Sequence, residues 1–544
     1  MDRFAQAMEA MTNKTYTENG QLAYKSTGVS KVLDFFAIAG AMRSREDRDI
    51  VTKMADAYAE NPALATRLLF HLSDIREGLG ERHTFRVALR WMAEYHPKTA
   101  MANLPLIPFF NRWDSAFVLI GTPCEQAMIE LVRAQLKEDL AKLQKGESVS
   151  LLAKWLPSVN ASSKETRKMA NFFIKKLNLT PRTYRLTLSA LREHLKVVET
   201  KMSAGKWDEI AYSQVPSRAM MGYRKAFWKH DEEGFGKYIA KVKSGEEAIK
   251  ASTLYPYDIV EKLMGYGSHA GDDVLEEQWK ALPNYIEGEN NVLVMADVSG
   301  SMNGRPMATS VGLAMYFAER NKGPYHNMFL TFSARPEYVR LKGFTLRERI
   351  SNAMSANWDQ NTNLEAAFNL VLQTALQNRL SNDELPKAIV VISDMEIDAA
   401  CRSDGGGYRY GYVPVAKYDF MTTLRKKFES YGYTLPSIVY WNVDSRQDTY
   451  LAKDNVPGVQ LVSGQSASTF KNVLLAIFDT PYKAMLRTLE SERYNCVVVP
   501  ESEMKAVAQA IPAAKATTRA VEADREEAIK KARVDAAKKA FDAF

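Results

Sequence analysis

From about residue 287 onward, short apolar runs alternate with amphipathic stretches, and this alternation limits the fold more than any other feature of the sequence. The apolar runs lie at 291–296, 328–332, 388–392, 437–441 and 459–462. The stretches between them carry apolar residues at helical spacing, at 307–320, 363–379, 416–430 and 467–478. Strands that alternate with helices predict an α/β domain with a largely parallel, doubly wound sheet over residues 287–500. A short run at 338–341 predicts one antiparallel edge strand.

Residues 1–286 have a different pattern, in which apolar residues recur at helical spacing almost throughout. The clearest segments are 49–73, 84–95, 125–145, 164–177 and 182–200, with prolines and glycines between them. We expect an all-α helical-repeat domain of consecutive helical hairpins, without a strict sequence repeat. Residues 501–544 are rich in Ala, Lys and Glu, and they predict a solvated helix or a frayed tail.

The cysteine content and the hydropathy of the chain exclude several classes of protein. Three widely separated cysteines, Cys124, Cys401 and Cys496, exclude a disulfide scaffold and a cysteine-based zinc site. No apolar run approaches the roughly 18 residues that cross a membrane, and no signal-peptide pattern follows Met1. We therefore expect a cytoplasmic protein without a membrane partner.

The strongest local pattern is Asp297-Val298-Ser299-Gly300-Ser301, directly after the first predicted strand. Asp394 follows the predicted strand at 388–392, and Thr362 precedes a predicted helix. Ligands of doubly wound sheets bind outside the carboxyl ends of the strands, so these side chains can converge. Hydroxyl and carboxylate oxygens are hard ligands that suit Mg²⁺, Mn²⁺ or Ca²⁺. Helix capping by the serines and by Asp394 is the alternative interpretation.

These residues resemble the metal-ion-dependent adhesion site of von Willebrand factor A domains. The resemblance implies one divalent cation held by Asp297, Ser299, Ser301, Thr362 and Asp394, with several contacts through water. It also implies one open coordination position, which an acidic group of a ligand would fill.

A wider resemblance extends over about residues 20–490. The segments at 74–82, 152–158, 254–257, 393–395 and 438–442 are similar to the domain-of-unknown-function 2828 group, which pairs a helical N-terminal region with a von Willebrand A domain. The order of parts is also similar to the Ro ribonucleoprotein (TROVE) family, in which a ring of HEAT-like helical repeats binds RNA, and the likeness implies HEAT-like repeats over residues 1–286. This likeness implies RNA as a partner and leaves open whether the helices close into a ring.

Positive charge is concentrated in one segment. Residues 164–206 contain eleven Lys and Arg against three Glu, a net charge of +8, whereas the whole chain has +7. In the predicted helix after Pro181, Arg185, Arg192 and Lys196 fall on one face. We predict that six side chains contact the phosphates of single-stranded or structured RNA: Lys168, Lys175, Arg182, Arg185, Arg192 and Lys196. A solvated helix face is the alternative.

No catalytic constellation is visible. The chain has no P-loop pattern, and its seven histidines are dispersed. We therefore expect a binding or scaffold protein and not an enzyme. The alternatives are a module that engages an acidic residue of a partner protein at the metal, and a metal-dependent hydrolase.

A glycine-rich loop follows the strand at 388–392. Gly405, Gly406 and Gly407 predict flexibility across residues 403–411. The loop leaves the edge of the sheet that carries the expected metal site. It would form a mobile rim around an anionic ligand, or it is a simple surface insertion.

Overall fold

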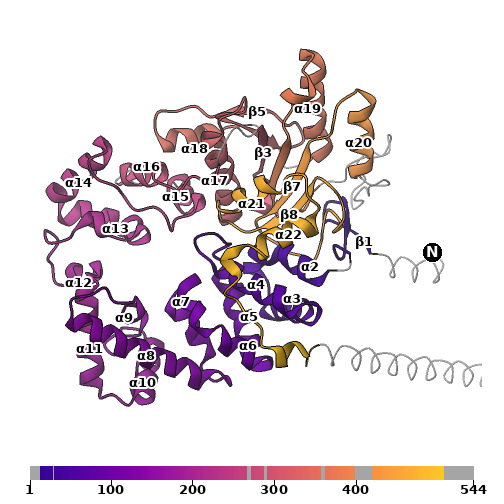
Figure 1. Cartoon of the computed structure of the whole chain (residues 1–544). Coiled ribbons are helices and arrows are strands. Elements are labelled where there is room, and N and C mark those ends of the chain that lie inside the picture. Colours follow the sequence, from indigo (N-terminus) through magenta and orange to yellow (C-terminus); the bar gives the residue numbers. More distant parts are fainter. Residues whose placement is uncertain are drawn as a thin grey trace, which may run out of the picture.

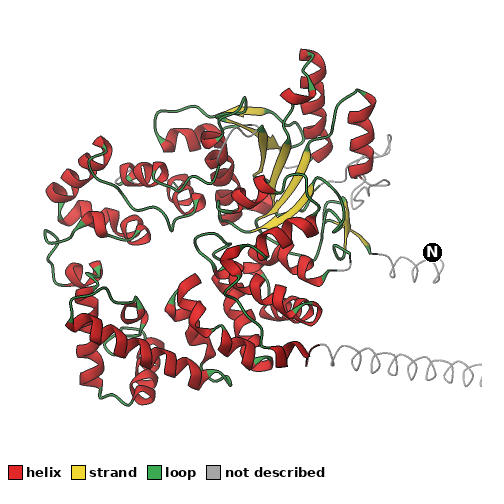
Figure 2. Ribbon diagram, viewed as in Figure 1, coloured by secondary structure: helices red, strands yellow, loops and turns green. Residues whose placement is uncertain are grey.

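The structure is a computed structural model that describes residues 13–28, 30–265, 271–286, 291–356, 362–397, 420–505 and 507. The expectation of a helix-rich N-terminal part followed by a sheet with helices is confirmed (Figure 1, Figure 2). The glycine-rich loop at 403–411, and nearly all of the tail at 501–544, lie outside the described residues. Among the described residues, no helix has both the length and the apolar character that crossing a membrane requires.

The described part of the C-terminal half contains a mixed sheet of six strands. In spatial order these are β5 (Tyr338–Arg340), β4 (Met328–Phe332), β3 (Val292–Asp297), β6 (Ala388–Ser393), β7 (Ser437–Asn442) and β8 (Val459–Ser463). Neighbouring strands are parallel except β4 and β5, so the expected antiparallel edge strand is present. The arrangement is compatible with the expected α/β domain.

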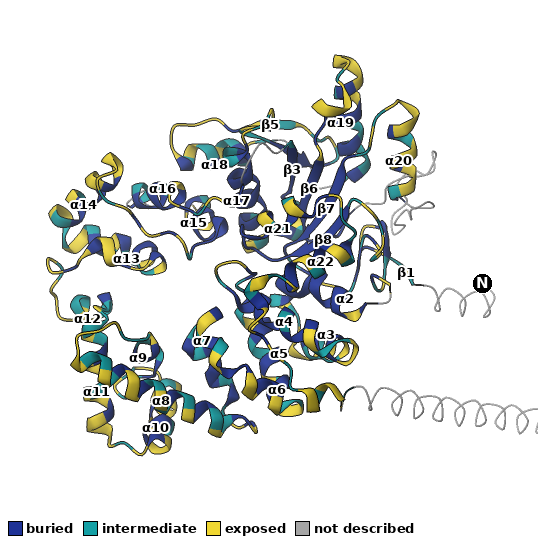
Figure 3. Cartoon of the chain, viewed as in Figure 1, coloured by how far each residue is buried: buried dark blue, intermediate teal, exposed yellow. Residues whose placement is uncertain are grey.

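Helices cover both faces of the sheet, which explains why its central strands are apolar without alternation (Figure 3). On one face, Val292, Val294 and Ala296 pack with residues of α15 (Pro256–Met264), α17 (Arg305–Arg320) and α21 (Thr469–Leu475). On the other face, Leu293 and Met295 share a core with α2 (Lys31–Ile38), α19 (Leu364–Asn378) and α20 (Phe420–Ser430). Helices of the N-terminal region therefore contribute to both faces.

The N-terminal helices form an arc that leaves the sheet at α2 and returns to it at α15 (Figure 1). Between them lie α3 (Asp47–Glu60), α4 (Pro62–Ser73), α5 (Arg82–Tyr95), α6 (Pro97–Ala102), α7 (Ile107–Phe110), α8 (Glu125–Gln144), α9 (Leu152–Trp155), α10 (Lys164–Leu177), α11 (Pro181–His194), α12 (Val198–Ser203), α13 (Ser217–His230) and α14 (Glu232–Ser244). After α15, α16 (Asp272–Lys280) leads to β3. The domain boundary near residue 287 stays a prediction.

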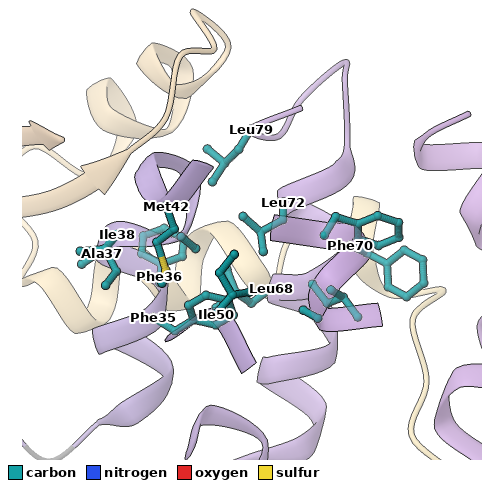
Figure 4. Close-up of a cluster of buried hydrophobic side chains, with 14 of the residues drawn as sticks. Phe35, Phe36, Ala37, Ile38, Met42, Ile50, Leu68, Phe70, Leu72 and Leu79 are labelled. Carbon is teal, nitrogen blue, oxygen red and sulfur yellow. The ribbon is translucent and has the colours of Figure 1, made fainter. Parts of the chain in front are cut away.

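The start of the arc is fixed to the sheet by close backbone contact. Phe35, Phe36, Ile38 and Met42 form a buried cluster with α3 and α4 (Figure 4). The N–H of Gly40 donates to Ser463 Oγ at 3.0 Å. A Cβ on Gly40 would stand 2.8 Å from the Cα of Gly464, so a side chain here would push the arc away from β8.

Two segments cross between the regions, and the sequence pattern gave no sign of either. A hairpin of β1 (Lys14–Tyr16) and β2 (Leu22–Tyr24) precedes the helices, and its Tyr24 bridges to Tyr450. After α22 (Pro481–Leu489), the chain returns to the N-terminal helices, where Asn103 Nδ2 donates to the carbonyl of Val498.

Candidate functional site

The candidate site lies between β3 and β6, where the strand order reverses. From β3 the chain continues to β4 on one side, whereas β6, β7 and β8 lie on the other side. The carboxyl ends of two adjacent parallel strands diverge at such a point and leave a crevice for a ligand. Ala296 pairs with Ile392, so Asp297 and Asp394 follow at the same edge.

Asp297 is fully buried at the end of β3. Its Oδ1 accepts from the N–H of Ser299 at 2.8 Å, and its Oδ2 accepts from Ser393 Oγ at 2.6 Å. Burial raises the pKa of Asp297 to about 6, against the effect of these hydrogen bonds. A buried carboxylate with a raised pKa gains from a nearby cation, because the cation favours the charged form.

Asp394 contributes the second carboxylate, and one of its oxygens has an ion pair but no hydrogen bond within the described residues. Its Oδ1 accepts from the N–H of Glu396 at 3.2 Å. Its Oδ2 is buried without a hydrogen-bond partner among the described residues, and the nearest cation, Arg446 Nη2, stands at 3.5 Å. Burial also raises the pKa of Asp394. Because buried polar atoms are nearly always paired, this oxygen fits a ligand position for a metal ion.

The hydroxyl groups complete the set of oxygen donors. Ser299 Oγ and Ser301 Oγ lie 3.0 Å apart. Thr362, just before α19, is buried, and its Oγ1 donates to the carbonyl of Glu396 at 3.3 Å, beside the loop that carries Asp394. The structure therefore brings the five residues of the expected metal site to one edge of the sheet. No group of three or more His, Cys, Asp or Glu that could hold a metal occurs within the described residues, so hydroxyls would have to complete the coordination.

The rim of the crevice is formed by residues that the sequence did not point to. Arg446, after β7, donates to the carbonyl of Ser301. At the turn of the N-terminal hairpin, the N–H of Glu18 donates to Glu396 Oε2 at 2.7 Å, and Glu18 Oε1 accepts from Gln447 at 3.0 Å. These are contacts between distant segments, and neither Glu18 nor Arg446 stands in a recognisable motif.

The predicted phosphate-binding residues separate into two groups. Lys168 and Lys175 on α10, Arg182 and Arg185 on α11, and Lys196 after α11 have exposed side chains (Figure 3 shows the exposed faces of α10 and α11). Arg192 differs from the expectation, because its guanidinium donates to the carbonyls of Ala153 and Leu156 and to Ser158 Oγ at 2.7–2.9 Å. These bonds commit Arg192 to holding residues 153–158. We call the exposed set of Lys168, Lys175, Arg182, Arg185 and Lys196 the basic surface.

Comparisons with known proteins agree with the resemblance to the domain-of-unknown-function 2828 group. The family described as Domain of unknown function (DUF2828) matches residues 17–111 and 175–291, which supports the resemblance to that group. A second family, Domain of unknown function (DUF7788), matches residues 291–513, the part that contains the sheet. Uncharacterized protein L728 of Acanthamoeba polyphaga mimivirus is 28% identical over 530 residues, which cover 90% of this chain and 89% of the relative.

Proposed function

We propose that this protein is a scaffold that holds one divalent cation in the crevice between β3 and β6 and binds RNA through its helical region. The observation that carries the proposal is the pair of buried carboxylates, Asp297 and Asp394, at the same edge as the hydroxyl groups of Ser299 and Ser301. In this proposal the sheet and its helices are a von Willebrand A-type domain, and the crevice is an adhesion-type metal site.

Asp297, Ser299, Ser301, Thr362 and Asp394 would hold the cation, and Mg²⁺ is the expected occupant, with Mn²⁺ or Ca²⁺ as substitutes. When bound, the cation supplies a positive charge beside two buried carboxylates and a coordination position for an anionic group of the ligand. Ser393 positions Asp297 through the 2.6 Å hydrogen bond to its Oδ2. The N–H of Glu396 positions Asp394 in the same way.

RNA is the proposed ligand of the helical region. The basic surface has no ion pair or side-chain hydrogen bond within the described part of the chain, so its charges are available to phosphates. In this proposal, the arc that leaves the sheet at α2 and returns at α15 (Figure 1) corresponds to the HEAT-like repeats of the TROVE architecture, and the sheet domain lies between its ends. That likeness supports RNA as the partner but does not identify the RNA.

The metal half of the proposal is tested by titration calorimetry with Mg²⁺. The wild type should release or absorb heat on binding one ion. Asp297→Asn, which keeps the shape that Ser393 contacts, should bind none. The matched control is Asp208→Ala, because Asp208 is exposed and lies on the helical region. Equal Mg²⁺ uptake by the wild type and Asp297→Asn would rule out this site.

The RNA half is tested by fluorescence anisotropy with a labelled single-stranded RNA. Arg182→Glu/Arg185→Glu removes two cations of the basic surface on α11. Arg425→Glu/Lys426→Glu, on the exposed side of α20, makes the same change of charge elsewhere. The slope of log affinity against log salt should become shallower by about 1.4 for two lost phosphate contacts in the first variant only. Equal slopes in the two variants would show that α11 is a solvated face.

A second candidate ligand is an acidic residue of a partner protein at the cation. Arg446 favours it, because this guanidinium stands 3.5 Å from Asp394 Oδ2 at the rim and can pair with an incoming carboxylate. In that case wild-type protein would show no affinity for RNA, and its partner binding would be lost in Asp297→Asn.

A further inference from the structure

Four arginines lie where the two arms of the helical arc meet. We call them the junction arginines: Arg82 and Arg86 on α5, Arg112 before the 3₁₀ turn at Trp113–Leu119, and Arg218 on α13. Arg82 lies within electrostatic range of the other three. None of them belongs to the basic surface or to the cation crevice.

The junction arginines have fewer negative partners than positive charges. Asp114 is shared, since its Oδ2 accepts from Arg86 at 2.8 Å and its Oδ1 accepts from Arg112 at 2.8 Å. Arg218 forms a two-bond pair with Asp258, at 3.0 and 2.8 Å. Arg82 has no hydrogen bond or ion pair within the described part of the chain. Two carboxylates therefore face four guanidinium groups.

The junction arginines are partly open to solvent, although Arg82, which carries the unpaired charge, is half-buried. The side chains of Arg86, Arg112 and Arg218 keep 32%, 30% and 46% of their surface exposed. Burial and the three neighbouring cations lower the pKa of Arg82, so its positive charge costs more free energy in the folded protein than in water. Groups with perturbed pKa values cluster at functional sites, and a surplus of positive charge attracts an anionic ligand.

We propose that the junction arginines form a phosphate-binding centre for the backbone of a single-stranded RNA. Guanidinium groups present two parallel N–H donors, which match two oxygens of a phosphate. Asp114 and Asp258 hold three of the guanidinium groups in place. The guanidinium group of Arg82 is the unpaired one. The centre rests on the proposed function for the identity of its ligand, and it adds a second contact region to it.

The surroundings favour a polymer over a single phosphate. Tyr257, at the start of α15, lies beside Arg218 and also under Arg305, whose guanidinium carbon stands 5.3 Å from the ring centre. Arg305 begins α17, four positions after Ser301 of the cation crevice. Arg305 thus extends the row of cationic side chains from the junction arginines toward the crevice. An extended polyanion, such as RNA, can contact charges along such a row.

The first test compares the RNA affinity of Arg82→Gln with that of Arg48→Gln, a matched loss of one exposed arginine on α3. The probe is a fluorescent single-stranded RNA, with thermal unfolding in chloride as the check of folding. Arg82→Gln should weaken binding about tenfold, as expected for one lost charged hydrogen-bond pair. It should also unfold at the same or a higher temperature than the wild type, because a repelled charge is removed. If both variants weaken RNA binding equally, the proposed phosphate-binding centre is rejected, whereas the proposal that the protein binds RNA is kept.

The second test uses inorganic phosphate as the probe and does not depend on RNA. An anion that binds the folded state raises the unfolding temperature. Sodium phosphate should stabilise the wild type and Arg48→Gln relative to sodium chloride of equal ionic strength, and it should not stabilise Arg82→Gln. Stabilisation that is absent from the wild type, or equal in all three proteins, would overturn the centre. Stabilisation that depends on Arg82, in a protein without RNA affinity, would support the centre and reject the proposed function.

Discussion

Gly80 lies directly against the hydroxyl group of Tyr255, so that a Cβ built on Gly80 would stand 1.7 Å from Tyr255 Oη. Gly80 also has a φ of +60°, which disfavours any other residue. The two residues come from opposite arms of the helical arc, in the segments 74–82 and 254–257 that carried the family resemblance. Their contact closes the arc beside the junction arginines.

We expect Gly80→Ala to destabilise the protein by about 2–4 kcal/mol, because either the Tyr255 ring or the backbone must move. The matched control is Gly146→Ala, since Gly146 has a φ of +73° with no atom within 4 Å of the added Cβ. Gly146→Ala should therefore lower the unfolding free energy only by the strain of a positive φ, about 1 kcal/mol. Urea unfolding measures both, and equal losses would show that the contact of Gly80 with Tyr255 does not stabilise the arc.

Arg493 is expected to contribute strongly to stability. Its Nη2 donates to Asp74 Oδ1 at 2.8 Å, and Asp74 is fully buried. Arg493→Gln leaves that carboxylate without its cation and should cost about 3 kcal/mol of unfolding free energy. Arg487→Gln breaks a pair between exposed Arg487 and Asp479 and should cost at most about 1 kcal/mol. A small effect of Arg493→Gln would mean that water satisfies Asp74 in the folded protein.

Arg192 should act on stability and not on RNA affinity. Its three hydrogen bonds hold residues 153–158 against α11. We expect Arg192→Gln to lower the unfolding free energy by about 1–3 kcal/mol, because buried carbonyls lose their donors. The RNA affinity should change no more than in Arg48→Gln. A loss of RNA affinity at unchanged stability would place Arg192 in the binding surface after all.

His71 makes the stability depend on pH. The ring is buried beside Phe36, with Nδ1 2.9 Å from Tyr494 Oη, and burial lowers the pKa of His71 from 6.5 to about 4. Between these values the unfolded chain binds a proton at His71 that the folded chain does not bind. The unfolding free energy should therefore fall as pH decreases from 6.5 toward about 4.

Urea unfolding at about pH 7 and about pH 5 measures this dependence on pH. His71→Gln should reduce it, whereas the control His194→Gln should not, because the ring of His194 lies at the surface against the carbonyl of Glu147. An unchanged dependence on pH in His71→Gln would assign the effect to other groups.

The sequence predicted the sheet because buried parallel strands are continuous apolar runs, and even the edge strand at Tyr338–Arg340 stood out. It also predicted which loops meet at the crevice, since the ends of parallel strands meet at one edge. It did not predict the hairpin at 14–24. Its strands have three residues each and include exposed polar side chains, and Tyr24 bridges to Tyr450 far along the chain.

The placement of charge was harder to predict. A helical wheel puts Arg192 beside Arg185, but it does not show that the carbonyls of Ala153 and Leu156 pack against the arginine. Likewise, Arg82 stood in a segment already noted for its resemblance. Its surplus of charge exists only because Arg112 and Arg218 are brought to it by tertiary packing.

The contact between Arg493 and Asp74 limits when the region around Asp74 can finish folding during synthesis. The two residues are 419 positions apart, and Tyr494 reaches the same carboxylate. At ordinary rates of translation, roughly 20–80 s pass between the synthesis of Asp74 and that of its partner. During this time the carboxylate of Asp74 lacks the cation that neutralises it in the folded protein. The packing around Asp74 can therefore be completed only after residue 493 has been made.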